Sequence, residues 1–320
     1  MLLDGYVRHG IEVFWLDSAE PEEFNFPQWG QVHWPNATYN NQTLGFAEGA
    51  SFAEMGMLFT LYWSQMFADG ARALGFPPVS LARASYAGTP RHGAALWSGD
   101  IHCTWDVLRT QVRTGLSAQT SGFGLWTTDI GGFIDGGGDA PKCDPANSTY
   151  RELWVRWFQY GATCPLFRQH GDRDTEIWLY GAQAEGIVAD LIRWRASIKG
   201  YLQGEVAKLS ATGRPINRPL AWDFPEDAAA WLVDDAYMFG DSYLAAPVLT
   251  AGATTRSVYL PAGQWRHVFT GTNYSGSQTY VVAAPLDSLP LFERLAPVPV
   301  PAAAAPAAAA AAEPTTPKLR

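Results

Sequence analysis

Polar side chains stand at the carboxyl ends of four apolar segments that we predict to be buried strands. The four polar residues, each followed by its predicted strand segment in parentheses, are Asp17 (residues 11–17, IEVFWLD), Arg83 (79–85, VSLARAS), Asp129 (122–130, GFGLWTTDI) and His170 (165–171, PLFRQHG). The carboxyl ends of parallel strands meet at one edge of a sheet, so these groups are expected to share a site. A single acid there could equally cap the next helix, but four polar ends in register favour a shared site.

Aromatic side chains accompany these polar groups. They are Trp15, Trp97, Trp126 and Phe133. Flat rings pack against the CH faces of a sugar, while the sugar hydroxyls need polar partners. The combination indicates a carbohydrate ligand, although each ring taken alone is equally consistent with core packing.

The segments between these strands have helical spacing and predict an α/β fold. They are residues 50–74, 104–116, 150–162 and 182–199, and a fifth strand is predicted at 219–224 (PLAWDF). Alternating strands and helices are typical of a parallel sheet that is covered on both faces.

The pattern changes in the last third of the chain. Short strands are predicted within residues 237–249, 255–260 and 265–269, with turns between them and no helical periodicity. We therefore divide the chain into an α/β domain (1–229), a small antiparallel module (230–294) and a Pro- and Ala-rich disordered tail (295–320).

Composition and charge exclude several classes of function. The 22 basic and 31 acidic side chains give a net charge of −9, which disfavours nucleic acid and anionic membranes as partners. No stretch of about 18 apolar residues appears, so no membrane span is predicted. The first residues do not read as a signal peptide, whereas sequons at Asn36, Asn41, Asn147 and Asn273 permit a secretory route. The sequence therefore predicts no particular cellular compartment.

Neither a metal site nor a nucleotide site is predicted. Three of the six histidines, His33, His92 and His102, lack metal-ligand spacing, and the acids Asp135, Asp139 and Asp144 are interpreted as part of an exposed loop. The run GGFIDGGGD lacks the strand and helix that flank a nucleotide loop. The cysteines Cys103, Cys143 and Cys164 form no CxxC pair, and we interpret them as scattered buried thiols rather than a bridge.

Six ordered blocks of the sequence resemble glycoside hydrolase family 31, the retaining α-glucosidases and α-xylosidases. The blocks are WLDSAEPE (15–22), ARASYAGTPRHGAALWSGDIHCTWDVLR (82–109), GFGLWTTDIGGF (122–133), RELWVRWFQYGATCPLFRQHG (151–171), GRPINRPLAWDFPED (213–227) and YMFGDSYLAAPVL (237–249). The form WLDSAEPE is similar to the α-xylosidase-like branch, and the substrate implied is an α-glucoside or an α-xyloside.

The resemblance implies a role for each site residue. Asp17 would be the nucleophile and Asp100 the acid/base, which in a retaining enzyme lie about 5–5.5 Å apart. The residues that would line the subsite for the cleaved sugar are Trp15, Arg83, Trp97, Asp129, Phe133 and His170. Arg83 and His170 would bind hydroxyls or keep Asp17 ionised, and Glu20 would form a local hydrogen bond. The family chemistry implies no metal and no organic cofactor.

The resemblance also implies the architecture. We expect an incomplete (β/α)8 TIM barrel that carries about strands 4–8, followed by a small antiparallel β-sandwich module. The absent barrel strands leave two alternatives open, a catalytically inactive fragment and a carbohydrate-binding relative of such an enzyme. Homo-oligomerisation would be one way to complete the barrel.

Overall fold

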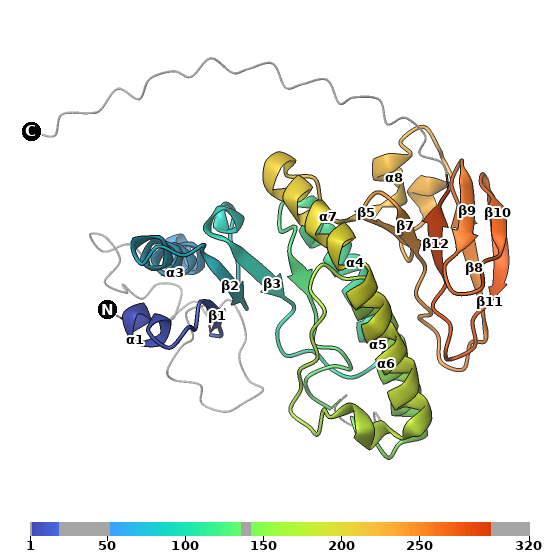
Figure 1. Cartoon of the computed structure of the whole chain (residues 1–320), viewed down its shortest axis with the longest axis horizontal. Coiled ribbons are helices and arrows are strands. Elements are labelled where there is room, and N and C mark those ends of the chain that lie inside the picture. The colour runs from blue at the N-terminus through green and yellow to red at the C-terminus, as the bar shows by residue number, and fades with distance from the viewer. Residues whose placement is uncertain (1, 19–51, 136–141, 296–320) are drawn as a thin grey trace, which may run out of the picture.

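The computed structural model describes residues 2–18, 52–135 and 142–295 (Figure 1). The predictions for Glu20, for the sequons at Asn36 and Asn41, for Asp139 and for the tail from 296 to 320 lie outside the described residues. The parallel strands lie at one end of the molecule and the antiparallel strands at the other, with long helices between them (Figure 1).

Four short strands form the parallel sheet in the order β1-β2-β3-β4. They are β1 (Val13–Leu16), β2 (Val79–Ala82), β3 (Ala94–Trp97) and β4 (Trp126–Thr127). The register sets Trp15 beside Leu81, and Leu96 beside Trp126. All four strands therefore point their carboxyl ends to the same edge, which is the edge where a site was predicted.

Helices connect and flank these strands. They are α1 (Leu2–Val7), α3 (Phe52–Ala73), the 3₁₀ helix η2 (Thr89–His92), α4 (Trp105–Thr120), α5 (Ser148–Ala162), the 3₁₀ helix η3 (Ile177–Tyr180), α6 (Ala182–Ser197) and α7 (Lys199–Thr212). Side chains cap the two central helices. The Thr104 hydroxyl accepts from the Val107 amide at the start of α4, and the Asn147 carbonyl accepts from the Thr149 amide at the start of α5. None of the described helices is long and apolar enough to span a bilayer.

The antiparallel part contains a six-stranded sheet, in the order β10-β9-β12-β7-β6-β5, and the separate pair β11-β8. The elements are β5 (Asn217–Pro219), α8 (Leu220–Asp223), the 3₁₀ helix η4 (Ala230–Leu232), β6 (Tyr237–Phe239), β7 (Tyr243–Ala245), β8 (Thr255–Leu260), β9 (Gln264–His267), β10 (Asn273–Ser275), β11 (Gln278–Ala283) and β12 (Leu291–Arg294).

Alternate residues of β6 enter two different cores. Tyr237 and Phe239 belong to the cluster that includes Trp157 of α5, whereas Met238 belongs to the cluster that includes Val258 of β8. Successive strand residues point to opposite faces of a sheet. The six-stranded sheet therefore packs on helices with one face and on the β8–β11 pair with the other.

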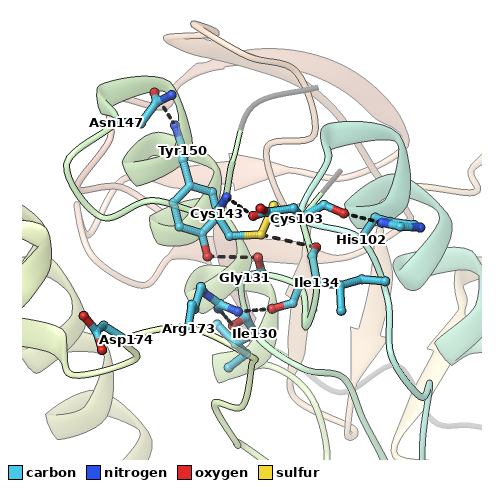
Figure 2. Close-up of a disulfide and its surroundings, with 12 residues drawn as sticks. His102, Cys103, Ile130, Gly131, Ile134, Cys143, Asn147, Tyr150, Arg173 and Asp174 are labelled. Atoms are coloured by element: carbon cyan, nitrogen blue, oxygen red, sulfur yellow. Dashed lines mark hydrogen bonds between the residues drawn. A yellow bond between two sulfur atoms is a disulfide. The ribbon is translucent and has the colours of Figure 1, made fainter. Parts of the chain in front are cut away.

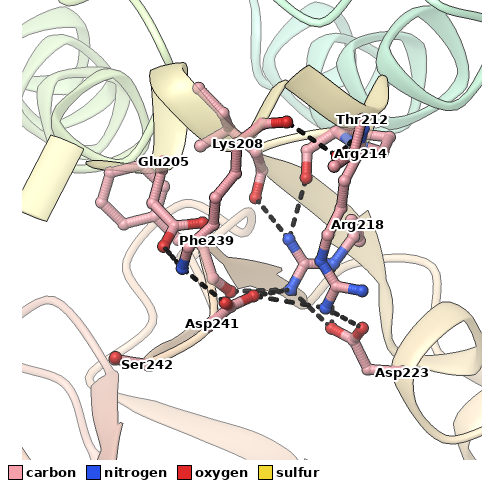
Figure 3. Close-up of polar contacts among 12 residues, drawn as sticks. Glu205, Lys208, Thr212, Arg214, Arg218, Asp223, Phe239, Asp241 and Ser242 are labelled. Carbon is pink, nitrogen blue, oxygen red and sulfur yellow. Dashed lines mark hydrogen bonds and ion pairs between the residues drawn. The ribbon is translucent and has the colours of Figure 1, made fainter. Parts of the chain in front are cut away.

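A buried ion network fixes the start of the antiparallel part (Figure 3). The Arg218 side chain is fully buried and donates to the Asp223 carboxylate at 2.7 and 2.9 Å and to the Gly240 carbonyl at 2.9 Å. Arg214 also donates to Asp223, at 2.7 Å, and Lys208 of α7 pairs with Asp241 at 2.6 Å. The network ties α7, α8 and the turn after β6 together.

Two predicted strands are wrong. Residues 165–171 form no strand and make only a single bridge between Gln169 and Ile130. Pro165 has no N–H, and its carbonyl accepts from Arg195 at 2.7 Å, so a ladder cannot run through it. The predicted strand at 219–224 is mostly the helical turn α8, because Asp223 folds back to pair with Arg218.

Several real elements were missed by the prediction, among them β3 and α7. The strand β3 is only four residues long and follows Gly93, where a Cβ atom would lie 2.0 Å from the Pro78 carbonyl oxygen. Helix α7 carries two glycines and follows α6 directly, so the periodicity predicted only the first of the two helices.

Candidate active site

All eight predicted site residues lie in the described structure, and the end of β1 presents the first of them. Asp17 directly follows Leu16, the last residue of β1. The next residue, Ser18, has a φ of 48°, which is rare for a residue with a side chain. Its amide donates to Asp17 Oδ1 at 2.9 Å. The sharp turn at Ser18 therefore holds the carboxylate at the strand end.

One arginine lies beside both carboxylates that the sequence resemblance singled out. Arg83 Nη1 is 3.1 Å from Asp17 Oδ1 and 3.9 Å from Asp100 Oδ2. The Arg83 side chain is 16% exposed, and the two carboxylates are 42% and 43% exposed. Arg83 follows β2 and Asp100 follows β3, so three neighbouring strand ends contribute to this cluster. A ligand from solvent can reach both carboxylates, while the cation lies beneath them.

Aromatic rings border the carboxylates on one side. The ring centroids of Trp15 and Trp97 are 5.8 Å apart, and His170 lies 5.3 Å from both Trp15 and Phe133. Trp97 is almost completely buried, whereas Trp15 is 51% exposed. The wall thus combines a fixed inner ring with an outer ring whose face is open to a ligand.

The third carboxylate, Asp129, is completely buried. Its Oδ1 pairs with Arg168, and its Oδ2 has no hydrogen-bond partner among the described residues. Burial raises the pKa of Asp129 above the ordinary value, while the Arg168 guanidinium opposes this rise. One acceptor oxygen of Asp129 is therefore left without a donor from the described part of the chain.

The sequence analysis missed Arg168, although a signal for it was present. Arg168 lies two residues before His170 in an extended segment, where alternate residues share a face. Its guanidinium carbon also lies 5.5 Å from the centroid of the Trp97 ring, within cation–π distance. Arg168 thus supports both the buried carboxylate and the inner aromatic wall.

A disulfide joins the segment after Asp100 to the loop after Phe133 (Figure 2). The bond links Cys103 and Cys143, so the interpretation of three scattered thiols is wrong; only Cys164 is a free, buried thiol. Cysteines 40 residues apart carry no local pairing signal, and their proximity arises because β3 and β4 are adjacent in the sheet.

Backbone hydrogen bonds reinforce this connection. The Cys103 amide donates to the Ile134 carbonyl at 3.1 Å, and the Phe133 amide donates to the Ile101 carbonyl at 2.7 Å. At Gly132, which has a φ of 83°, a Cβ atom would lie 2.5 Å from Cys103 Cα. Only glycine permits this close approach. The loop that carries Asp100 is therefore fixed against the loop that carries Phe133.

One group in the described part of the chain resembles a metal-binding cluster. The side-chain ligand atoms of Cys103, Asp135 and Cys143 lie within 4.8 Å of one another. The disulfide uses both sulfurs, and Asp135 Oδ1 accepts from the Cys143 amide at 2.7 Å. In this state the cluster offers no thiolate to a metal.

Carboxylates beside an arginine and an aromatic wall are the features of a carbohydrate-processing site, and comparison with known proteins gives the family. The TIM-barrel domain model of glycosyl hydrolase family 31 matches residues 2–203, and the C-terminal domain model of the same family matches residues 213–295. The chain belongs to glycosyl hydrolase family 31. The resemblance found in the sequence is thus confirmed, as is the barrel-domain class.

The chain is similar to other family members both in sequence and in structure. The chain is 32% identical to an alpha-xylosidase of Saccharolobus solfataricus over 91% of its own length and 38% of that protein, and 32% identical to alpha-xylosidase A of Aspergillus niger over 91% and 44%. It superposes on a family 31 alpha-xylosidase from a soil metagenome, solved with xylose, with a TM-score of 0.82 and 35% identity, covering 92% of this chain and 44% of that one. The chain thus spans less than half the length of these relatives.

Proposed function

We propose that this chain carries the catalytic residues of a retaining α-glycosidase that hydrolyses α-glucosides or α-xylosides. Asp17 attacks the anomeric carbon as a carboxylate and forms a covalent glycosyl ester. Asp100 first protonates the departing oxygen and then deprotonates the incoming water. The observation that carries the proposal is the position of Arg83, 3.1 Å from one carboxylate and 3.9 Å from the other.

The position of Arg83 also ties the two acids to one part of the site. Its Nη1 atom lies within ion-pair distance of both carboxylates, 3.1 Å from Asp17 and 3.9 Å from Asp100. One partly buried cation therefore keeps the proposed nucleophile and the proposed acid/base close to each other.

The remaining site residues are assigned to the sugar. Asp129 Oδ2, which has no partner among the described residues, accepts from a sugar hydroxyl. His170 and Arg83 bind further hydroxyls, while Trp15 and Phe133 pack on the CH faces of the ring and Trp97 supports them from within. The substrate assignment is supported by the relatives of the chain, which are alpha-xylosidases and alpha-glucosidases.

We infer that the four parallel strands and the extended segment at Gln169 are the later strands of a (β/α)8 barrel. The match to the family's barrel domain and the common edge of all four strand ends support this inference. We assign the packing of the six-stranded sheet against the β8–β11 pair to the family's C-terminal β-sandwich, in line with the match at residues 213–295.

Trapping of the glycosyl ester tests the assignment of the nucleophile. A 5-fluoro-α-glycosyl fluoride should label the chain once, and peptide mass spectrometry should locate the label on Asp17. The Asp17→Asn variant should take up no label, whereas Asp100→Asn should take it up from this activated donor, which needs no acid catalysis. A label on another carboxylate would contradict the assignment.

A further inference from the structure

A groove lies in the antiparallel part of the chain. It has a volume of about 600 Å³ and lies between the segment after α8 and the loops that follow β8 and β10. These elements lie at the opposite end of the molecule from β1 (Figure 1). Trp231 of η4 contacts one of the residues that line the groove, because its indole N–H donates at 2.9 Å to the carbonyl of Pro225. We call this feature the Trp231 groove.

Aromatic side chains lie in the Trp231 groove and next to it. The Trp231 ring is 66% exposed, yet its hydrogen bond to Pro225 fixes its orientation. Trp222 of α8, the helix that packs on η4, is 46% exposed. Phe224 and Tyr259 line the groove itself. Large rings held in place at a surface offer flat faces to a ligand at little cost in side-chain entropy.

Oriented carboxylates provide the polar part. Asp227 Oδ1 accepts from the Ala229 amide at 3.0 Å, and Asp227 Oδ2 accepts from the Tyr259 hydroxyl at 2.5 Å, so this carboxylate is held in one orientation. Glu226 is exposed beside it. Ser277 lines the opposite wall, where its φ of 62° holds its turn in a left-handed conformation.

The charges in the groove select among classes of ligand. Carboxylates on its wall repel phosphates and other anions. A bound Ca²⁺ takes 6–8 oxygen ligands, whereas Asp223 is already paired with Arg214 and Arg218, and Asp227 with Tyr259 and a backbone amide. A neutral ligand with many hydroxyls fits, because it can donate to the carboxylates while its CH faces cover the rings.

We propose that the Trp231 groove is a second carbohydrate-binding site, separate from the Asp17 and Asp100 site, which holds a neutral oligosaccharide. The sugar rings stack on Trp231, and the carboxylates of Glu226 and Asp227 accept from its hydroxyls. Such a site would keep a long substrate attached to the protein while the catalytic site releases product. This inference does not depend on catalytic activity of the chain.

Calorimetry with maltoheptaose and with a xyloglucan heptasaccharide tests the proposal. Both sugars are titrated into the chain with the substitution Asp17→Asn, which prevents turnover. Adding Trp231→Ala should weaken the binding of at least one sugar by tenfold or more. Trp178→Ala is the matched control, because Trp178 is 64% exposed on η3, outside the groove, and its replacement should leave the affinity unchanged.

Two further variants separate the outcomes. Glu226→Gln removes one charged acceptor without removing a ring and should weaken binding about fivefold even if Trp231→Ala proves unstable. Trp15→Ala should remove binding at the catalytic site and leave the Trp231 groove intact. Sugar binding that survives Trp231→Ala and Glu226→Gln but is lost in Trp15→Ala would overturn the second site and leave the proposed function standing. Absence of sugar binding in the Asp17→Asn parent would also overturn the proposal of a second site.

Discussion

At the scale of single residues, the candidate site depends on two arginines at different depths. Arg83 lies beneath two solvent-accessible carboxylates, and Arg168 pairs with a carboxylate that is completely buried. An exposed carboxylate needs little help to ionise, whereas a buried one needs a cation within contact distance. Arg168 supplies that cation for the buried carboxylate of Asp129.

Replacement of Arg168 should change the pH dependence of sugar binding. Burial raises the pKa of Asp129 and Arg168 is the largest opposing influence, so Arg168→Met should raise this pKa further. The carboxylate then takes up a proton at a higher pH. The lowest pH at which the chain still binds xylose or glucose, which we call the acidic limit, should therefore move to higher pH. Titration by NMR between pH 4 and 8 would measure the shift.

A matched control is Arg113→Met, because Arg113 pairs with Asp234 at a surface where both side chains are more than half exposed. That variant should keep the wild-type acidic limit. An unchanged limit in Arg168→Met as well would show that Arg168 does not control the charge of Asp129.

The sequence predicted most of these residues for a physical reason. Asp17, Arg83, Asp129 and His170 each follow an apolar run, so a local pattern was enough to find them. Asp100 was found only through the family resemblance, because the strand before it was not recognised. The pairing of Asp129 with Arg168 joins residues that are 39 positions apart, and no local pattern contains it.

At the scale of elements, the position of Asp100 depends on the segment between β3 and α4. This segment is held by the Cys103–Cys143 disulfide and by the backbone bonds from Cys103 and Phe133 (Figure 2). The strand β3 was missed because four residues are too few to show a periodicity. Its place in the sheet follows from pairing with β2 and β4, which is a property of the fold and not of the segment.

Loss of the disulfide should loosen the acid/base segment. Cys143→Ser should lower the free energy of unfolding by about 2–4 kcal/mol. It should also increase amide hydrogen exchange at Cys103, whose N–H bonds to Ile134. Exchange followed by mass spectrometry measures the second effect. Cys164→Ala keeps the disulfide and should retain slow exchange at Cys103, and equal protection in both variants would contradict this role.

At the scale of the whole molecule, a buried arginine joins the helical and antiparallel parts. Arg156 of α5 is 1% exposed and donates to the carbonyls of Ala253, Ala284, Pro285 and Ser288. These carbonyls all lie in loops around β8, β11 and β12. One side chain therefore binds four carbonyls, of which that of Ala284 is buried, in a part of the chain almost a hundred residues or more away, and this couples the two parts.

Replacement of Arg156 should destabilise the whole chain. A buried acceptor left without a donor costs about 1–3 kcal/mol, and the Ala284 carbonyl is such an acceptor, so Arg156→Met should lower the free energy of unfolding by at least about 1 kcal/mol. Denaturant titration would measure this loss. Arg193→Met removes a 74% exposed arginine of α6 and should change stability by no more than about 0.5 kcal/mol. Equal effects of the two substitutions would contradict the coupling.

The sequence predicted the order of the two parts but not how they join. The change from helical to strand periodicity predicted an antiparallel module from residue 230, yet β5 (Asn217–Pro219) already pairs with β6 in that sheet. A three-residue strand that ends in proline carries no recognisable pattern. Its pairing with β6 is antiparallel and sets Asn217 beside Phe239, which only the folded sheet reveals.

Release of p-nitrophenol from the aryl α-xyloside and the aryl α-glucoside tests the proposed catalysis most directly. The purified chain should release it from at least one of the two, and the preferred sugar would identify the substrate. Asp17→Asn should reduce the rate at least a thousandfold while the thermal unfolding transition stays in place. Release that persists in Asp17→Asn, or no release from a chain that is demonstrably folded, would contradict the proposal that this chain carries a working Asp17 and Asp100 pair.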